Sequence, residues 1–460
     1  MNKKISSKGW IGKKVENFQK INFDPVDLQC LDIKKYPYLL ESSSRGNDKN
    51  RFSILFYKPE FSLEKVDGEF LKKFDKLWNE NKVDQEQLFW GDKKLPFCGG
   101  WFVYLGYELA KEIEPTLRIP KSPFQLPTAF ASRVSSALIY DNIDNEIFIV
   151  SDDISKFSTI TSDIESDLAK LPILEEERIS GTVEILFKGS PEEHQMHVKK
   201  CIEYIFQGEI FQANLSRLWN FKINNNIRAT DIYRQLRKKN PSPFSGLVNH
   251  KNSTIISSSP ERLVSVNENL LETRPIAGTR PRGSSGIHDI ELSQELINSD
   301  KEKAEHLMLV DLERNDISKV CEPGSVKVNE MMIIETYAHV HHIVSNIRGS
   351  KVKGLSPGTV ISSVFPGGTI TGCPKVRCME ILGELEKVGR GPYTGSFGYV
   401  THSGNMDINI LIRSMLLENQ NLFFRAGGGI VADSIPESET LETEAKANGM
   451  LKALESFENV

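Results

Sequence analysis

Two pairs of glutamates spaced Glu-x-x-Glu are the strongest chemical signal in this 460-residue sequence: Glu302 with Glu305, and Glu439 with Glu442. Residues three apart share one face of a helix, so each pair would set two carboxylates side by side. Paired carboxylates of this kind suit Mg²⁺, which takes few protein oxygens, keeps waters and leaves room for an anionic substrate. A single pair is usually a solvated acidic face, but two separate pairs favour a metal site.

Three consecutive glycines, Gly427, Gly428 and Gly429, follow an apolar run and come shortly before the second acidic pair. Without Cβ atoms, the backbone there can approach a ligand closely or adopt positive φ, and its N–H groups can face an anion. Lys446 falls on the same helical face as Glu439 and Glu442. Together with the glutamates, these residues predict a site for a small multi-anionic substrate. The alternative is a flexible turn before a solvated helix.

Two further segments could hold a carboxylate. Arg413 follows an apolar strand-like run in NILIRSM, and its planar guanidinium can bind a carboxylate through two hydrogen bonds. Most arginines that end strands are instead solvated. The run GGTITGCPK is a glycine loop leading into a helix, and it lacks the Gly-Lys-Ser/Thr ending of a nucleotide-binding loop. The helix N-terminus could still bind an anion, while a plain glycine turn is equally consistent with the pattern.

The histidines of YAHVHH are the remaining candidates for acid–base chemistry. In a strand, His339 and His341 share one face and His342 points the other way. A metal site would need neighbouring ligands, and a histidine that is buried and hydrogen-bonded is more common. We therefore single out only His342, as an acid, a base or a hydrogen-bond donor.

Composition limits the class of protein. With 39% hydrophobic residues the chain can bury a large core, and its net charge of −5 gives no reason to expect nucleic acid or an anionic membrane as a partner. The basic start lacks the apolar segment of a signal peptide, and no apolar run reaches transmembrane length. Six cysteines show no Cys-x-x-Cys pairing, so we expect reduced thiols and a cytoplasmic protein.

Strands joined by short turns dominate the pattern that must position these residues. We expect a hairpin from YPYLLESSS and RFSILFYKP, a helical region over 60–94, and a tight turn at Gly99 and Gly100 leading into a buried strand. Further strands are expected at 135–140 and 146–151, and a helix at 191–206 capped by Ser190. The predicted fold is α/β of the α+β type: large antiparallel sheets around a central site, with helices outside.

A change in composition predicts the organisation of the chain. Residues 152–192 become polar and acidic, and we place a linker at 171–189 there. It would separate an N-terminal region, residues 1–170, from a catalytic region, residues 190–457. No repeat or low-complexity tract is present, which excludes a solenoid.

Several long motifs, in order, resemble the chorismate-binding enzymes, a family that includes the first components of anthranilate and aminodeoxychorismate synthases and also isochorismate and salicylate synthases. They are ETRPIAGTRPRG, HLMLVDLERND, ETYAHVHHIVS, FPGGTITGCPKVRCMEI and GSFGYVTHSGNMDINILIRS. The resemblance is strong over residues 190–455 and looser in the first half. It implies two antiparallel sheets packed around the site, as the strand pattern also predicts.

The resemblance assigns roles to individual residues. Glu305 and Glu442 correspond to the two Mg²⁺ ligands, with Glu302 and Glu439 as supporting carboxylates. His342 corresponds to the histidine beside the substrate ring. The chorismate contacts correspond to Thr369, Tyr393, Arg413, Gly427, Gly428, Gly429 and Lys446. Metal-assisted departure of the C4 hydroxyl is the implied chemistry.

Two positions bear on the reaction. Gln212 stands where isochorismate and salicylate synthases have a water-activating lysine, which disfavours those activities. Aminodeoxychorismate synthases typically carry a lysine nucleophile in the motif Pro-Ile-x-Gly-Thr, and this chain has Ala277 there, followed by Thr279, as anthranilate synthases do. Against this, EIFQANLSR, GGTITGCPKVRC, YAHVHHIVSNIRG and MDINILIRS are closer to the aminodeoxychorismate branch.

We therefore expect aminodeoxychorismate synthase component I, which converts chorismate and ammonia to 4-amino-4-deoxychorismate for p-aminobenzoate and folate synthesis. The alternatives are anthranilate synthase component I, and a non-catalytic regulatory protein that binds chorismate or tryptophan, which two retained Glu pairs disfavour. Ammonia would come from a glutamine amidotransferase subunit, because the chain shows no nucleophilic Cys-His pair, and Cys98 in PFCGGW is better explained by a structural turn. The segment Leu39 to Ser42, LLES, resembles part of a tryptophan inhibitory site.

Overall fold

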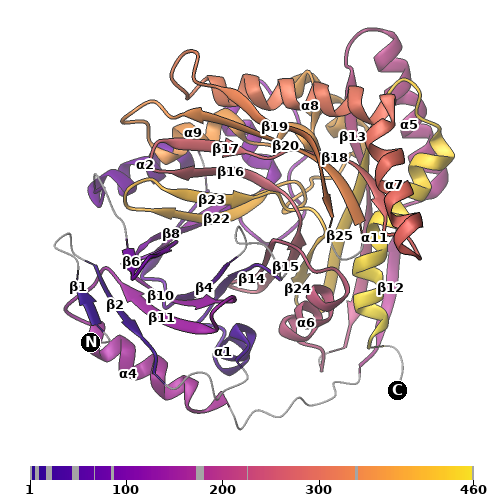
Figure 1. The fold of residues 1–460 in the computed structure, drawn as a ribbon. Coiled ribbons are helices and arrows are strands. Elements are labelled where there is room, and N and C mark those ends of the chain that lie inside the picture. Colours follow the sequence, from indigo (N-terminus) through magenta and orange to yellow (C-terminus); the bar gives the residue numbers. More distant parts are fainter. Residues whose placement is uncertain are drawn as a thin grey trace.

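Two large antiparallel sheets stacked face to face form the centre of the molecule, and helices cover their outer faces (Figure 1). The computed structural model describes residues 3–5, 10–16, 23–43, 51–66, 68–83, 88–171, 181–224, 226–336 and 340–457. The architecture confirms the expected antiparallel sheets with helices outside.

The larger sheet, sheet A, has 13 strands in the described residues. In spatial order they are β1 (Lys3–Ile5), β2 (Ile11–Lys14), β11 (Glu146–Ser151), β10 (Ser136–Asp141), β4 (Phe52–Tyr57), β3 (Tyr38–Glu41), β14 (Phe244–His250), β15 (Ser253–Ser259), β24 (Ser414–Glu418), β25 (Asn421–Ile430), β13 (Gln212–Ile223) and β12 (Val183–Lys188), with β21 (Gly372–Cys373) paired to β13.

The second sheet, sheet B, has 10 strands in the described residues. In spatial order they are β18 (Ile276–Pro281), β20 (Val340–Ser350), β17 (Leu270–Thr273), β16 (Arg262–Asn267), β23 (Met406–Asn409), β22 (Ser396–Thr401), β8 (Gly100–Leu105), β9 (Ala129–Val134) and β5 (Phe61–Glu64), with β19 (Lys327–Thr336) paired to β20. A separate hairpin joins β6 (Leu88–Trp90) to β7 (Lys93–Leu95).

The helices lie outside the sheets. They are α1 (Pro25–Leu31), α2 (Phe70–Glu80), α3 (Ala110–Ile113), α4 (Phe157–Leu168), α5 (Pro191–Phe206), α6 (Ala229–Lys239), α7 (Gly286–Asn298), α8 (Asp300–Ser318), α9 (Pro357–Val364), α10 (Lys375–Glu386) and α11 (Pro436–Glu455). Sheet A packs its outer face on α1, α4, α6 and α11, and sheet B packs on α2, α8 and α9.

An aromatic core fills the space between the sheets. Tyr38 of sheet A stacks on Phe102 of sheet B with ring centroids 4.2 Å apart, and Phe56, Phe130 and Phe397 surround them. Each such buried side chain stabilises the fold by about 1.5–3 kcal/mol relative to exposure. The core thus fixes the two sheets relative to each other and, with them, the residues at their shared edge.

The chain passes between the sheets at two adjacent crossings. Residues 260–261 lead from β15 to β16, and residues 410–413 lead from β23 back to β24. The Ile410 N–H donates to the Glu261 carbonyl oxygen at 3.0 Å, which holds the crossings together. Because β24 pairs with β25 only as far as Phe424, residues 425–430 pair with β13 alone and leave one edge open. The predicted glycine triplet lies along this open edge.

Local predictions can be compared directly with the elements. The hairpin of β3 and β4, the turn at Gly99 and Gly100 into buried β8, and helix α5 are confirmed, and the Ser190 hydroxyl caps α5 by accepting from the Glu193 N–H at 3.1 Å. The expected helical region over 60–94 is wrong, because α2 is the only helix among the residues described in that range, between β5 and the β6–β7 hairpin. Sheet A takes strands from both sides of residues 171–189, and the division of the chain there stays a prediction.

Candidate active site

The two glutamate pairs lie on different helices, and the open edge of sheet A brings them together. Glu302 and Glu305 are on α8, and Glu439 and Glu442 are on α11. A Cβ added to Gly428 would lie 3.4 Å from Glu442 Oε1 and 3.5 Å from Glu439 Oε2, and one on neighbouring Gly429 would lie 3.1 Å from Glu305 Oε1. Adjacent glycines of one strand therefore face carboxylates from both helices.

Glu305 is the most perturbed of the four carboxyls. Burial and the nearby charges of Glu302 and Glu442 raise its pKa to about 7, against the opposing effects of Lys446 and of Gln212. Gln212 Nε2 donates to Glu305 Oε1 at 2.8 Å, so β13 orients this carboxylate. Like charges that raise one another's pKa in this way gain stability when a cation joins them.

The α11 carboxylates differ in exposure. Glu439 is buried, its Oε1 accepts from the Ser434 hydroxyl at 2.7 Å, and its Oε2 is buried without a hydrogen-bond partner. Glu442 is 47% exposed and pairs with Lys446 at 2.6 Å. Lys446 therefore lies on the predicted face of α11, where it pairs with Glu442.

None of the three glycines adopts positive φ. Gly427 and Gly429 are explained instead by neighbouring atoms that lie too close to the backbone to leave room for a Cβ atom. A Cβ on Gly427 would come 2.8 Å from the Tyr393 hydroxyl oxygen, and one on Gly429 would come 2.1 Å from Gln212 Nε2. Buried Tyr393, one of the predicted contacts, thus packs directly against the strand. Replacing Gly427 or Gly429 would push these side chains away from their present positions.

The carboxylates fit a hard divalent cation. The unpartnered Glu439 Oε2 and the raised pKa of Glu305 show that negative charge and acceptor atoms are in excess. Within the described residues, three such donor atoms lie within 4.8 Å of one another only at Asp141, Asp144 and Glu146, which are already paired with Arg51 and Lys93. Mg²⁺ needs only one or two protein carboxylates, completed by water and substrate, so Glu305 and Glu442 satisfy its requirement.

Arg413 lies at the return crossing, on the same open edge as the glycines. It adopts φ +50, an uncommon conformation for a residue with a side chain, and its Nη1 donates to Asn240 Oδ1 at 3.4 Å. No carboxylate of the described chain forms an ion pair with Arg413. A half-buried guanidinium with an amide as its partner retains its charge for a carboxylate ligand.

Glu261 is a site residue that the sequence reasoning missed. It occupies the other crossing, 4% exposed, and burial together with nearby Glu313 raises its pKa to about 8, against the nearby positive charge of Arg413. Glu261 Oε1 and Thr369 Oγ1 are both buried without a hydrogen-bond partner. The available signal was a carboxylate between two strand-like runs, in SSSPERLVSV, which sequence alone leaves indistinguishable from a turn residue.

Thr369 is held by two contacts of its loop. The carboxyl of buried Glu313 accepts from the Gly368 N–H at 3.1 Å and from the Thr273 hydroxyl at 3.0 Å. The Thr369 carbonyl accepts from Asn214 Nδ2 at 3.3 Å, and Asn214 pairs with Gly429 across the strands. The predicted residue Thr369 is therefore tied to the glycine strand.

His342 faces the bulge of β18. Its Nδ1 lies 2.9 Å from the Thr279 hydroxyl, and Thr279 pairs with it across the strands. Burial, with the nearby charges of Arg413 and Lys446, lowers its pKa to about 3, so the imidazole is neutral. Ala277 is buried on the same strand, next to Gly278, whose φ is +71. His341 instead contacts Asp289 at 2.9 Å, and His339 lies outside the described residues.

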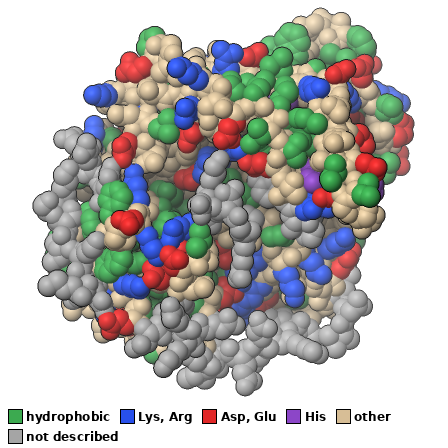
Figure 2. Space-filling model, viewed as in Figure 1, with side chains coloured by type: hydrophobic (Ala, Val, Ile, Leu, Met, Phe, Trp, Pro, Cys, Tyr) green, Lys and Arg blue, Asp and Glu red, His purple; other side chains and the backbone are tan. Residues whose placement is uncertain are grey.

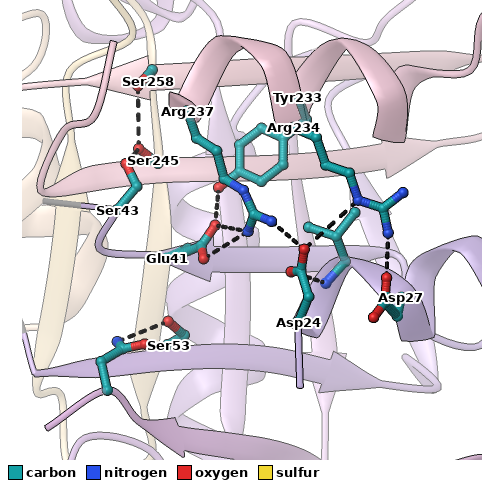
Figure 3. Close-up of polar contacts among 12 residues, drawn as sticks. Asp24, Asp27, Glu41, Ser43, Ser53, Tyr233, Arg234, Arg237, Ser245 and Ser258 are labelled. Carbon is teal, nitrogen blue, oxygen red and sulfur yellow. Dashed lines mark hydrogen bonds and ion pairs between the residues drawn. The ribbon is translucent and has the colours of Figure 1, made fainter. Parts of the chain in front are cut away.

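Three residues of the LLES segment line a cavity between the two sheets. Leu40, Glu41 and Ser42 line a space of about 180 Å³ with Pro243, Phe244 and Tyr399. Arg237 Nη1 and the Tyr233 hydroxyl donate to the Glu41 carboxylate at 2.9 and 2.6 Å, and Arg237 and Arg234 also pair with Asp24 and Asp27 (Figure 3). This ion-pair cluster fixes α6 to β3.

Charged side chains of both signs are mixed on the face drawn in Figure 2. On the described part of the face in Figure 2, basic and acidic side chains are interspersed, without the broad basic area that nucleic acid binding requires. Among the described helices, none is both long and apolar enough to cross a membrane.

Comparison with known proteins finds relatives that cover most of the chain. Residues 36–452 match the family described as chorismate binding enzyme. The chain is 36% identical to anthranilate synthase component 1 of Aquifex aeolicus, covering 94% of this chain and 92% of that protein, and 36% identical to aminodeoxychorismate synthase component 1 of Bacillus subtilis, covering 97% of each. It also matches the crystal structure of anthranilate synthase component I from Streptococcus pneumoniae, with TM-score 0.76, 30% identity and coverage of 88% and 93%.

This protein therefore belongs to the chorismate-binding enzymes. Its relatives divide between two names, anthranilate synthase and aminodeoxychorismate synthase.

Proposed function

We propose that this chain aminates chorismate with ammonia to give 4-amino-4-deoxychorismate, as aminodeoxychorismate synthase component I. The main support for a substrate with two carboxylates is the separation of charge along the open edge of sheet A. Arg413 lies at one crossing, and the carboxylates Glu305 and Glu442 face the glycines of the same edge. A substrate with two carboxylates can place one on the guanidinium and the other toward the acidic cluster through a cation.

Mg²⁺ is the proposed cation, held by Glu305 and Glu442 and supported by Glu302 and Glu439. When bound, it would neutralise the facing carboxylates and polarise the substrate carboxylate, which favours departure of the C4 hydroxyl. Gln212 keeps Glu305 turned toward the glycines through its 2.8 Å hydrogen bond. Thr369, Tyr393 and the N–H groups of Gly427 and Gly429, which point away from β13 because backbone groups alternate along an antiparallel strand, would orient the substrate.

Glu261 is the proposed proton donor for the departing hydroxyl. With its pKa raised to about 8, the carboxyl is mostly protonated at neutral pH and sits beside Thr369 and Arg413. The C4 hydroxyl must gain a proton to leave as water. A carboxylic acid whose pKa lies near the operating pH is well suited to supply that proton. Neutral His342, held by Thr279, would pack beside the ring as a hydrogen-bonding group.

The position of amination separates two candidate products. The motifs nearest the aminodeoxychorismate branch, and the match to the Bacillus subtilis protein over 97% of both chains, support the 4-amino product. Ala277 supports the second candidate, anthranilate synthase component I, because alanine cannot act as the lysine nucleophile that attacks C2 before ammonia enters at C4. In the first case the shape of the pocket must direct ammonia to C4.

The ammonia is proposed to come from a glutamine amidotransferase subunit, as the name component 1 implies for the relatives. Cys98 is buried in the core between the sheets, in the turn before β8, where a structural role accounts for it.

Product analysis tests the proposal. Wild-type protein is incubated with chorismate, Mg²⁺ and an ammonium salt, and the products are separated by liquid chromatography with fluorescence detection. We expect 4-amino-4-deoxychorismate as the main product. Fluorescent anthranilate as the main product would establish the second candidate, and consumption of neither chorismate nor ammonia would refute both.

A further inference from the structure

Arg413, Asn240 and Ser258 form a closed ring of hydrogen bonds. Arg413 Nη1 donates to Asn240 Oδ1 at 3.4 Å, and Asn240 Nδ2 donates to the Ser258 carbonyl at 3.3 Å. The Ser258 N–H then donates to the Arg413 carbonyl at 3.2 Å. The ring fixes both the backbone of Arg413, which has φ +50, and one nitrogen of its guanidinium.

The amide of Asn240 has only one orientation that satisfies this ring. Exchanging its oxygen and nitrogen would set the NH₂ group against the guanidinium donor and the oxygen against the Ser258 carbonyl. The residue therefore has to be both donor and acceptor, which neither an aspartate nor an aliphatic side chain can be.

Asn240 is itself held by three elements. Its N–H donates to the Leu236 carbonyl at 2.8 Å, ending α6, and its carbonyl accepts from the Ser258 hydroxyl of β15. On the third side, a Cβ added to Gly449 of α11 would lie 3.3 Å from Asn240 Cβ. Gly449 follows Lys446 by one turn, so the helix that carries Glu439 and Glu442 packs directly on Asn240.

Neutrality is the second property that matters. Asn240 contacts the guanidinium without cancelling its charge, and within the described chain Arg413 makes no ion pair. An aspartate at the same place would form one, and a substrate carboxylate would then have to compete with a fixed internal anion. An amide orients Arg413 while leaving it cationic.

We propose that Asn240 is a positioning residue that sets the guanidinium of Arg413 and its spacing from the carboxylates of α11, and so governs how tightly the substrate carboxylate binds. The proposal rests on the proposed function in one respect: Arg413 is taken to bind a carboxylate of chorismate.

Steady-state kinetics of Asn240→Asp provide the first test. We expect the KM for chorismate to rise at least about 10-fold while kcat changes less than about 3-fold, because the variant weakens substrate binding and leaves the proton donor and metal ligands in place. Asn79→Asp, on the exposed face of α2, is the matched control for an added negative charge and should behave as wild type. If Asn240 only ended α6, Asn240→Asp would leave KM unchanged, and that result would overturn the proposal.

A binding measurement separates this proposal from the proposed function. The shift of melting temperature caused by chorismate and Mg²⁺ is compared for wild type, Asn240→Asp and Arg413→Leu. We expect a shift in wild type that is reduced in Asn240→Asp and absent in Arg413→Leu. Binding without amination would refute the proposed function alone, and equal shifts in wild type and Asn240→Asp would refute the role of Asn240 alone. No shift in wild type would refute both, because the role of Asn240 depends on chorismate binding.

A double-mutant cycle without substrate checks the contact itself. In Asn240→Asp the new carboxylate can pair with Arg413. The change in melting temperature caused by Asn240→Asp should therefore be more favourable when Arg413 is present than when it has been replaced in Arg413→Leu. Equal changes in the two backgrounds would show that residue 240 does not act on Arg413.

Discussion

Replacing Glu261 by glutamine tests whether a buried acid at the sheet crossing is protonated at neutral pH. The carboxyl has an ordinary pKa of 4.5 and a pKa of about 8 in the folded protein, with burial as the main cause. The folded state therefore keeps a proton that the unfolded chain has already released between these two values. Stability must fall as pH rises through this window, because the unfolded state binds fewer protons.

The expected magnitude follows from the pKa. Between pH 7 and pH 9 the unfolded chain carries no proton on Glu261, while the folded protein goes from almost fully protonated to almost fully ionised. Summed over this range, the difference in bound protons amounts to one pH unit, which lowers the unfolding free energy by about 1.4 kcal/mol. Glutamine has the same shape as the neutral acid and cannot ionise, so Glu261→Gln should lack this part of the pH dependence. Urea unfolding at several pH values, with wild type and Glu261→Gln in parallel, measures the difference. Glu80→Gln on exposed α2 is the control.

The same variant should lose activity. At a fixed concentration of free ammonia, wild-type kcat/KM for chorismate should fall on the alkaline side with an apparent pKa near that of Glu261, about 8. Loss of the proton donor should lower kcat by about 10²–10⁴-fold. Parallel pH dependence of unfolding in the two proteins would show that Glu261 is already ionised at pH 7, and the assignment of the proton donor would fail with it.

Three other outcomes are expected. Glu305→Gln or Glu442→Gln should lower kcat at least about 100-fold while the protein stays folded by circular dichroism, since each removes a proposed Mg²⁺ ligand; full activity of either variant in metal-depleted buffer would contradict the metal site. The isolated chain should use ammonium salts but not glutamine until an amidotransferase subunit is added, and glutamine-dependent turnover by the purified chain alone would reveal an unrecognised glutaminase site. Ala277→Lys should preserve or raise formation of the 4-amino product by restoring a nucleophile. If wild type instead forms anthranilate and Ala277→Lys forms less of it, the second candidate is identified.

Local signals were sufficient wherever a structure depends on a few neighbouring residues. Ser190 followed by Pro191 predicted the start of α5, since a hydroxyl cap and a proline at the first helical position act within one turn. The spacing of Glu439 and Glu442 likewise predicted one shared helical face. Residues 60–94 show the limit of such reasoning: Phe61–Glu64 became β5 because it pairs with β9, a partner about 70 residues away that local pattern does not reveal.

The sequence by itself determined the ingredients of the site: two acidic pairs, three glycines, an arginine and a histidine, with motifs that resemble one family. Only the tertiary structure decided that glycines of β25 bring carboxylates of α8 and α11 together, that Glu261 is buried enough to hold its proton, and that Asn240 braces Arg413. The physical reason is the distance along the chain between the residues that determine each feature. Helix caps and helical faces arise within a few residues, whereas burial, a pKa and the orientation of a guanidinium depend on strand pairings between segments more than 100 residues apart.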